Sequence, residues 1–137
     1  MKNKLIAYAG ALLFLIAADG LWLGLVMPQH YQAWIGPLMR EEPLLLPAVA
    51  FYLFYPVGVV VFAVMPGLAQ RHWQSSAALG ALLGLLAYGT YDLSNLATLE
   101  GWPWQLTLVD MLWGACMTSA AAITAFFAVR AWGIKHL

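Results

Sequence analysis

The chain has 137 residues, of which 64% are hydrophobic and 9% are charged, and its formal net charge is zero. Soluble domains carry about 25% charged residues, so this composition excludes an ordinary soluble domain and indicates an integral membrane protein. The zero net charge and the lack of a basic run argue against a nucleic-acid partner. Cys116 is the only cysteine, which excludes an internal disulfide.

Four apolar segments of about twenty residues follow one another along the chain, near 5–26, 44–65, 77–97 and 107–128. The run from Leu5 to Met27 is long enough to cross a bilayer, so we expect an uncleaved first helix rather than a removed signal. Helix-breaking residues separate the segments, namely Pro28, Pro37 and Pro43, then Pro66-Gly67, then Gly101 and Pro103. We therefore predict one all-α domain over residues 1–137, a bundle of four transmembrane helices.

Basic residues are distributed unequally among the connections between these segments. If both termini face the cytoplasm, the cytoplasmic side holds Lys2, Lys4, Arg71, Arg130 and Lys135. The opposite side then holds Arg40 as its single basic residue, together with Glu41, Glu42 and Glu100. Because Lys and Arg concentrate on the cytoplasmic side of membrane proteins, we predict that both termini are cytoplasmic.

Three aspartates, Asp19, Asp92 and Asp110, interrupt the apolar segments, and no Lys or Arg inside a segment neutralises them. A carboxylate at the centre of a bilayer costs roughly 2.5–3.5 kcal/mol on insertion scales. At about 1.5 Å per residue, they lie about 10, 7 and 5 Å from the outer ends of their helices, so all three fall in the outer half of the bundle. We interpret them as the catalytic or ion-binding groups of one site. The alternative is structural, with Asp92 in an interhelical network and Asp110 complementing the dipole at the start of its helix.

Aromatic and polar side chains lie near these aspartates at helical spacing. Asp19 and Trp22 share a helix face, as do Asp110 and Trp113. The side chains predicted to bind a ligand are Trp22, Tyr52, Tyr55, Tyr88, Tyr91, Asn95 and Trp113. Carboxylates surrounded by aromatic faces favour a cation, which predicts an outward-facing pocket for a positively charged group.

The connection 27–43 contains His30, Tyr31 and Trp34, and we expect it to form a short interfacial helix over the mouth of this pocket. Pro56, inside the second apolar segment, frees a backbone carbonyl and is expected to permit a kink. One histidine at an unfixed spacing from the aspartates does not define a metal site, so we predict none. The sequence identifies no cofactor.

Four stretches resemble one known family: 51–55 (FYLFY), 88–98 (YGTYDLSNLAT), 101–103 (GWP) and 110–114 (DMLWG). Through them the chain is similar to the bacterial membrane-protein family catalogued as domain of unknown function 2177. The resemblance implies a small bacterial inner-membrane protein with four helices. It implies no particular activity.

Three functions remain open at this point. The first is a pocket that binds, or also chemically modifies, a lipid-like or cationic amphiphilic small molecule, with Asp92 and Asp19 as an acid–base pair. The second is a proton-coupled carrier that acts as a homodimer, in which the acids alternately bind a proton and a cation. The third is a non-catalytic subunit of a membrane assembly. The sequence leaves open whether the chain is an enzyme, and it favours the lipid bilayer and a small molecule as partners.

Overall fold

The structure, a computed structural model, describes residues 1–134, so Lys135 of the predicted cytoplasmic set lies outside the described residues. The described part of the chain is helical and contains no strand. In chain order its elements are α1 (Lys2–Leu21), a π turn (Trp22–Val26), α2 (Pro28–Ile35), a 3-10 turn (Gly36–Leu38), α3 (Leu45–Val59), a second π turn (Val60–Val64), α4 (Met65–Gln70), α5 (Trp73–Thr98) and α6 (Trp104–Trp132). The predicted all-helical fold class is confirmed.

Within residues 1–134, three helical segments are long and apolar enough to cross a membrane, namely Lys2–Val26, Leu45–Gln70 and Trp104–Trp132. α5 is comparable in length, with 26 residues. Its second half carries Tyr88, Thr90, Tyr91, Asp92, Ser94 and Asn95, which lower its hydropathy. The fourth predicted segment is therefore a helix, but its composition alone does not mark it as a membrane span.

The predicted break at Pro66-Gly67 is wrong, because the helix that starts at Leu45 continues through both residues to Gln70. Pro56 lies inside this helix, and a π turn begins four residues after it. Pro66 comes just after that π turn, where the regular hydrogen-bond pattern of the helix is already interrupted. The helix ends at Arg71, whose φ of 59° lies in the left-handed region.

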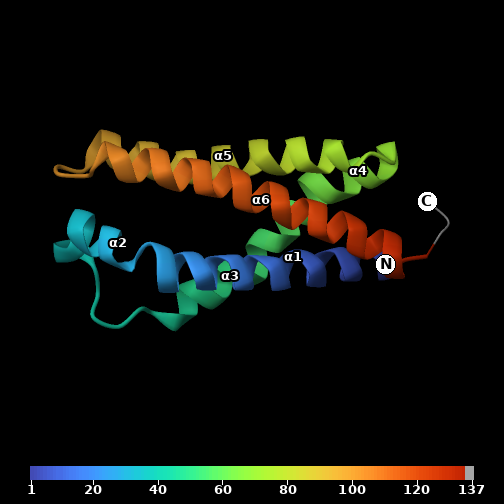
Figure 1. The fold of residues 1–137 in the computed structure, drawn as a ribbon, viewed down its shortest axis with the longest axis horizontal. Coiled ribbons are helices and arrows are strands. Elements are labelled where there is room, and N and C mark those ends of the chain that lie inside the picture. The colour runs from blue at the N-terminus through green and yellow to red at the C-terminus, as the bar shows by residue number, and fades with distance from the viewer. Residues whose placement is uncertain (135–137) are drawn as a thin grey trace.

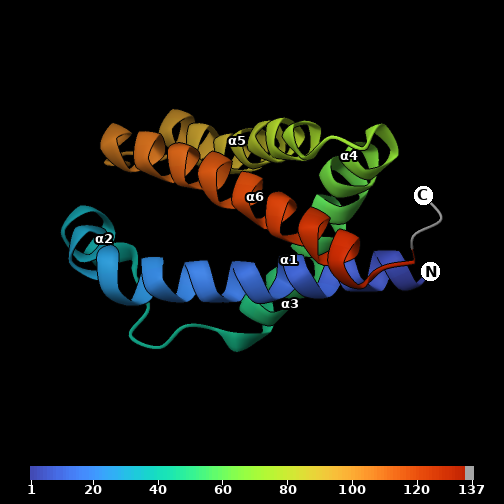
Figure 2. The same cartoon turned by 45° about the vertical axis from the view of Figure 1, so that its right-hand side comes forward.

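α6 is the central helix of the bundle. It runs antiparallel to α5 over most of its length, and it also packs against α1, α3 and the π turn after α3 (Figure 1, Figure 2). The close approach of α5 and α6 requires glycine, since a Cβ added to Gly84 would overlap the backbone of Gly114. α1 also approaches α6 closely, since a Cβ added to Gly10 would lie only 3.3 Å from Ala125 Cα and 3.3 Å from Ala128 Cβ. Small residues at helix contacts are typical of bundles in membranes.

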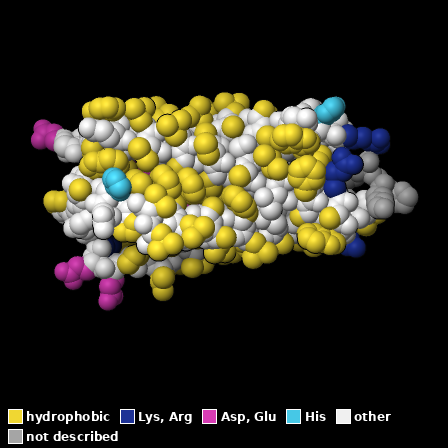
Figure 3. All heavy atoms as spheres, in the orientation of Figure 1, with side chains coloured by type: hydrophobic (Ala, Val, Ile, Leu, Met, Phe, Trp, Pro, Cys, Tyr) yellow, Lys and Arg dark blue, Asp and Glu magenta, His cyan; other side chains and the backbone are white. Residues whose placement is uncertain are grey.

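The surface of the bundle is an apolar belt between two charged ends (Figure 3). The end at which α1 begins and α6 ends, called here the basic end, carries Lys2, Lys4, Arg71 and Arg130. The opposite, acidic end carries Glu41, Glu42 and Glu100 together with Arg40. On the belt, Phe54 and Phe62 are 75% and 63% exposed. Such a surface suits contact with lipid rather than with water.

Candidate functional site

Asp19 lies two residues before the end of α1, in the half of the bundle near the acidic end. Its side chain is only 5% exposed. Oδ1 accepts a hydrogen bond from Trp113 Nε1 of α6 at 3.1 Å, and Oδ2 accepts one from the Tyr52 hydroxyl of α3 at 3.0 Å. Each carboxyl oxygen therefore has a donor from a different helix, so the group is satisfied and joins three helices.

The π turn after α1 forms an aromatic wall beside Asp19. The turn is closed by the Met27 N–H, which donates to the Trp22 carbonyl at 2.9 Å. The rings of Trp22 and Trp113 stack in parallel, with 4.2 Å between their centroids and 3° between their planes. π turns in proteins frequently occur at functional sites. Here the turn holds a flat indole pair next to a buried carboxyl group.

The short helix expected in the connection 27–43 is present as α2, and it contributes Tyr31 to the site. The Tyr31 hydroxyl donates to Asp110 Oδ1 at 2.8 Å and accepts a hydrogen bond from Trp22 Nε1 at 3.2 Å. Burial, and then the negative charge of Asp110, raise the pKa of this hydroxyl well above its ordinary value, so it remains a donor. The predicted site residues do not include Tyr31, whose only sequence signal is its place in the expected interfacial helix.

These side chains line a cavity of about 600 Å³, called here the Asp19 cavity. Seven of the ten predicted site residues lie on its wall, namely Asp19, Trp22, Tyr52, Tyr55, Tyr88, Tyr91 and Trp113. Tyr31 and Phe51 line it as well. The remaining predicted residues, Asp92, Asn95 and Asp110, do not line it. Sequence spacing thus finds the aromatic wall and one of the three carboxyl groups.

Two tyrosines of the wall are fixed by contacts with α6. The Tyr55 hydroxyl and Thr118 Oγ1 form a hydrogen bond of 2.8 Å. The Tyr88 ring packs so closely on Gly114 that a Cβ added to this glycine would overlap the ring. The shape of the cavity therefore depends on the same close approach of α5 and α6 that the glycines permit.

A second hollow of about 630 Å³ shares Asp19, Leu23 and Tyr52 with the Asp19 cavity. Its other walls are aliphatic side chains and glycines from α1, the π turn after it and α3. Ile16 and Leu53 on these walls are 49% and 51% exposed and belong to the apolar belt. Asp19 and Tyr52 therefore lie between the aromatic cavity and the lipid-facing side of the bundle.

Asp92 has a different environment from Asp19. Its side chain is fully buried, and neither carboxyl oxygen has a hydrogen-bond partner among the described residues. Apart from the hydrogen bonds of the helix backbone, its backbone carbonyl accepts a hydrogen bond from the Thr107 hydroxyl at 3.5 Å. The structure therefore does not bring Asp92 and Asp19 together at the wall of one cavity, as the predicted acid–base pair requires. In the described part of the chain no three His, Cys, Asp or Glu side chains converge as a set that could hold a metal ion.

The family model of predicted membrane proteins designated DUF2177 matches residues 4–127, which include every residue of this site. The chain belongs to the DUF2177 family. It is a membrane protein, and the family expected from the sequence is confirmed. No curated protein and no solved structure matches the chain. The family description of this DUF2177 protein gives no ligand and no reaction, so its function rests on the chemistry of the site.

Proposed function

We propose that this DUF2177 protein binds a cationic amphiphile, a small molecule with a positively charged head and an apolar tail, in the Asp19 cavity. The observation that carries the proposal is the buried Asp19 carboxyl group, which lines an aromatic cavity of about 600 Å³ and is held by Trp113 and Tyr52. Cavities of roughly 300–1,000 Å³ with few polar groups are typical of small-molecule sites.

The wall of the cavity favours a quaternary ammonium head. Aromatic faces attract a cation, with an energy of about 0.5–2 kcal/mol per contact. Asp19 adds a carboxylate in a region of low dielectric constant, where its attraction for a cation is stronger than in water. Both Asp19 oxygens already accept hydrogen bonds from Trp113 and Tyr52. A head group that attracts by charge, and needs no further hydrogen bond, is therefore the best match.

The adjoining hollow supports an apolar tail. It begins at Asp19 and Tyr52 and continues between α1 and α3, where Ile16 and Leu53 are exposed on the apolar belt. A molecule whose head lies in the Asp19 cavity could place its tail along this surface, in contact with lipid. The ligand would then enter from the bilayer rather than from water.

We further propose that α5 is a fourth membrane span, that both termini are cytoplasmic, and that the membrane is the bacterial inner membrane. The hydroxyls of Thr90 and Thr98 donate to carbonyls one turn earlier in α5, at 2.7 Å each, and Ser94 bonds in the same way. Hydroxyls satisfied within their own helix are tolerated next to lipid. The separation of basic and acidic ends in Figure 3 supports the orientation.

Native mass spectrometry of the detergent-extracted protein with added dodecyltrimethylammonium tests the ligand proposal. The wild type is expected to retain one bound cation, and Asp19→Asn is expected to bind it about tenfold or more weakly, a change of about 1.4 kcal/mol or more. Asp92→Asn is the matched control, because it makes the same change at a buried aspartate that does not line the cavity. Dodecanol lacks the charge, so comparing its binding with that of the cation tests whether the charged head group is required for binding.

Equal binding of the cation by the wild type and Asp19→Asn would contradict the proposal, as would no binding at all. The hydrogen bonds of Asp19 would then serve only to hold α1, α3 and α6 together. Equal losses in Asp19→Asn and Asp92→Asn would indicate a general effect of lost negative charge, which also contradicts a site at Asp19.

Cysteine labelling in intact cells tests the topology. In a Cys116→Ala background, Glu41→Cys and Glu100→Cys are expected to react with a membrane-impermeant maleimide, and Gln70→Cys only after permeabilisation. Glu100 lies between α5 and α6, so its labelling decides whether α5 crosses the membrane. Protection of Glu100→Cys in intact cells would reduce the number of spans to three.

A further inference from the structure

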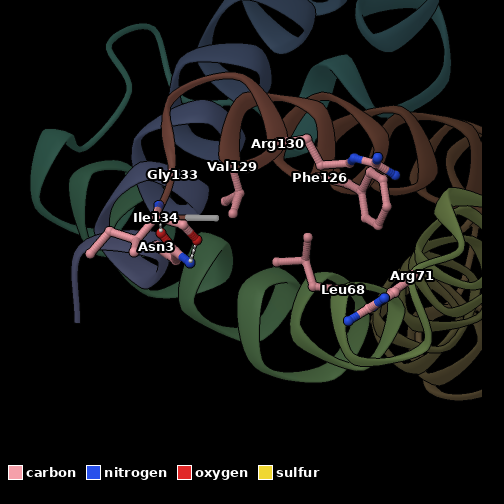
Figure 4. Close-up of a pocket in the computed structure, with 8 residues that line it drawn as sticks. All are labelled: Asn3, Leu68, Arg71, Phe126, Val129, Arg130, Gly133 and Ile134. Carbon is pink, nitrogen blue, oxygen red and sulfur yellow. Dashed lines mark hydrogen bonds between the residues drawn. The ribbon is translucent and has the colours of Figure 1, made fainter. Parts of the chain in front are cut away.

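A cavity of about 430 Å³ lies at the basic end of the bundle, between the start of α1, α4 and the end of α6 (Figure 4). Leu68, Phe126 and Val129 form its apolar floor. Arg71, directly after α4, and Arg130 of α6 contribute a guanidinium group each, from opposite walls (Figure 4). This cavity shares no residue with the Asp19 cavity.

Asn3 fixes one wall of this cavity. Its Oδ1 accepts a hydrogen bond from the Ile134 N–H at 2.8 Å, and its Nδ2 donates to the Ile134 carbonyl at 3.3 Å (Figure 4). A Cβ added to Gly133 would overlap the backbone carbonyl oxygen of Val129, so this position next to Asn3 requires glycine. The two-way amide contact joins the first turn of α1 to the segment after α6, which gives the cavity a defined shape.

Both arginines are exposed; Arg130 has one side-chain contact, and Arg71 has an unusual backbone conformation. The guanidinium carbon of Arg130 lies 5.9 Å from the centre of the Phe126 ring, a cation–π contact. Arg71 has a φ of 59°, at the position after a helix where glycine or asparagine is normally favoured. An arginine in place of glycine or asparagine at this position supports a role for its side chain.

Among residues 1–134, no acidic side chain lines the cavity to balance its positive charge. All six acidic residues of the chain lie elsewhere, namely Asp19, Glu41, Glu42, Asp92, Glu100 and Asp110. None of them lines the cavity. Guanidinium groups bind phosphate with two parallel hydrogen bonds, which makes a pair of them suited to a doubly charged phosphate group.

We propose that this cavity binds a phosphate monoester, with Arg71 and Arg130 as its ligands. The apolar floor of Leu68, Phe126 and Val129 lies beneath the phosphate and receives the carbon atoms attached to it. The same chemistry is offered by the headgroup of an anionic lipid and by a soluble phosphate ester. The site is independent of the cation-binding function proposed for the Asp19 cavity.

Native mass spectrometry with dioleoylphosphatidic acid as the probe tests this proposal. Arg71→Gln/Arg130→Gln is expected to weaken its binding about tenfold or more. Lys2→Gln/Lys4→Gln removes the same charge from the basic end but outside the cavity, and less than about a twofold change is expected. Equal losses in the two double variants would reduce the effect to general surface charge and would overturn the proposal.

Glycerol 3-phosphate and inorganic phosphate separate the two sources of the phosphate group. Displacement of the lipid by either soluble probe would support recognition of the phosphate group alone, and displacement only by a second lipid would support a lipid headgroup site. Failure of every probe to bind would overturn the proposal.

Arg71→Gly is a control for misfolding, because it removes one guanidinium group and also relieves the strain of the left-handed backbone at this position. This variant is expected to unfold at a higher temperature than the wild type and still to bind phosphatidic acid more weakly than the wild type does. If it binds phosphatidic acid as tightly as the wild type, Arg71 is not a ligand of the phosphate group.

Discussion

Replacing Asp92 with leucine is expected to stabilise the protein, whereas the same replacement at Asp19 is expected to destabilise it. Leucine has the same branched arrangement of heavy atoms as aspartate, so the two variants differ mainly in the hydrogen bonds they remove. The comparison therefore measures the environments of two buried carboxyl groups in the same half of the bundle.

At Asp92 the substitution removes two fully buried oxygens that lack a hydrogen-bond partner. An unsatisfied buried polar group costs about 1–3 kcal/mol, and this cost disappears in the leucine variant. The methyl groups of leucine are larger than carboxyl oxygens, and swaps that nearly conserve shape cost less than about 1.5 kcal/mol in packing strain. The expected net effect is an increase of about 1 kcal/mol in the free energy of unfolding.

At Asp19 the substitution leaves Trp113 Nε1 and the Tyr52 hydroxyl without their acceptor. Two part-buried donors that lose their partner cost about 1–3 kcal/mol each, so the expected loss of unfolding free energy is about 2–6 kcal/mol. The two variants should therefore differ by about 3 kcal/mol or more, with opposite signs.

Thermal unfolding in one detergent, followed by the circular dichroism of the helices, measures both effects. For a chain of this length 1 kcal/mol corresponds to roughly 3–5 °C in Tm, so Asp92→Leu should raise Tm by a few degrees and Asp19→Leu should lower it by about 6 °C or more. A fall in Tm for Asp92→Leu as large as that for Asp19→Leu would refute the reasoning. Asp92 would then have a stabilising partner, such as a buried water or a ligand.

Two further substitutions test contacts around the Asp19 cavity. Tyr31→Phe removes the donor to Asp110, and it should increase hydrogen exchange of residues 28–35 while α5 and α6 remain protected; unchanged exchange would show that this bond does not hold α2. Gly114→Ala places a methyl group against the Tyr88 ring and should lower the free energy of unfolding by about 1–3 kcal/mol. A Tm equal to that of the wild type would show that α5 and α6 adjust without cost.

Much of the aromatic wall is predictable from the sequence, because helical spacing fixes which side chains share a face. Asp19 and Trp22 lie on one face of the first helix, and Tyr88 lies on a glycine-rich face of α5. Each of these faces must turn inward, since a buried carboxyl group and small contact residues cannot face lipid. Once the faces are known, we expect them to meet in one layer, because the three aspartates lie at similar distances, about 5–10 Å, from the outer ends of their helices.

The roles of Asp92, Tyr31 and Pro66 depend on tertiary contacts that spacing does not encode. Asp92 and Tyr88 are four residues apart on α5, yet only Tyr88 lines the Asp19 cavity. Tyr31 reaches the site because α2 folds back over the bundle, which no periodicity within α2 specifies. Proline generally breaks a helix because it lacks the N–H that would bond the preceding turn. The π turn before Pro66 already alters this hydrogen-bond pattern, so the helix continues past the proline.

The central position of α6 has a consequence for the order in which the protein is completed during synthesis. α1, α3 and α5 leave the ribosome before α6, although α6 is the helix that each of them packs against. Tyr52 can bond Asp19 as soon as α3 is inserted, but Trp113 arrives only with the last helix. Until then the Asp19 carboxyl group has one donor in place of two, so the site is complete only after α6 has been inserted.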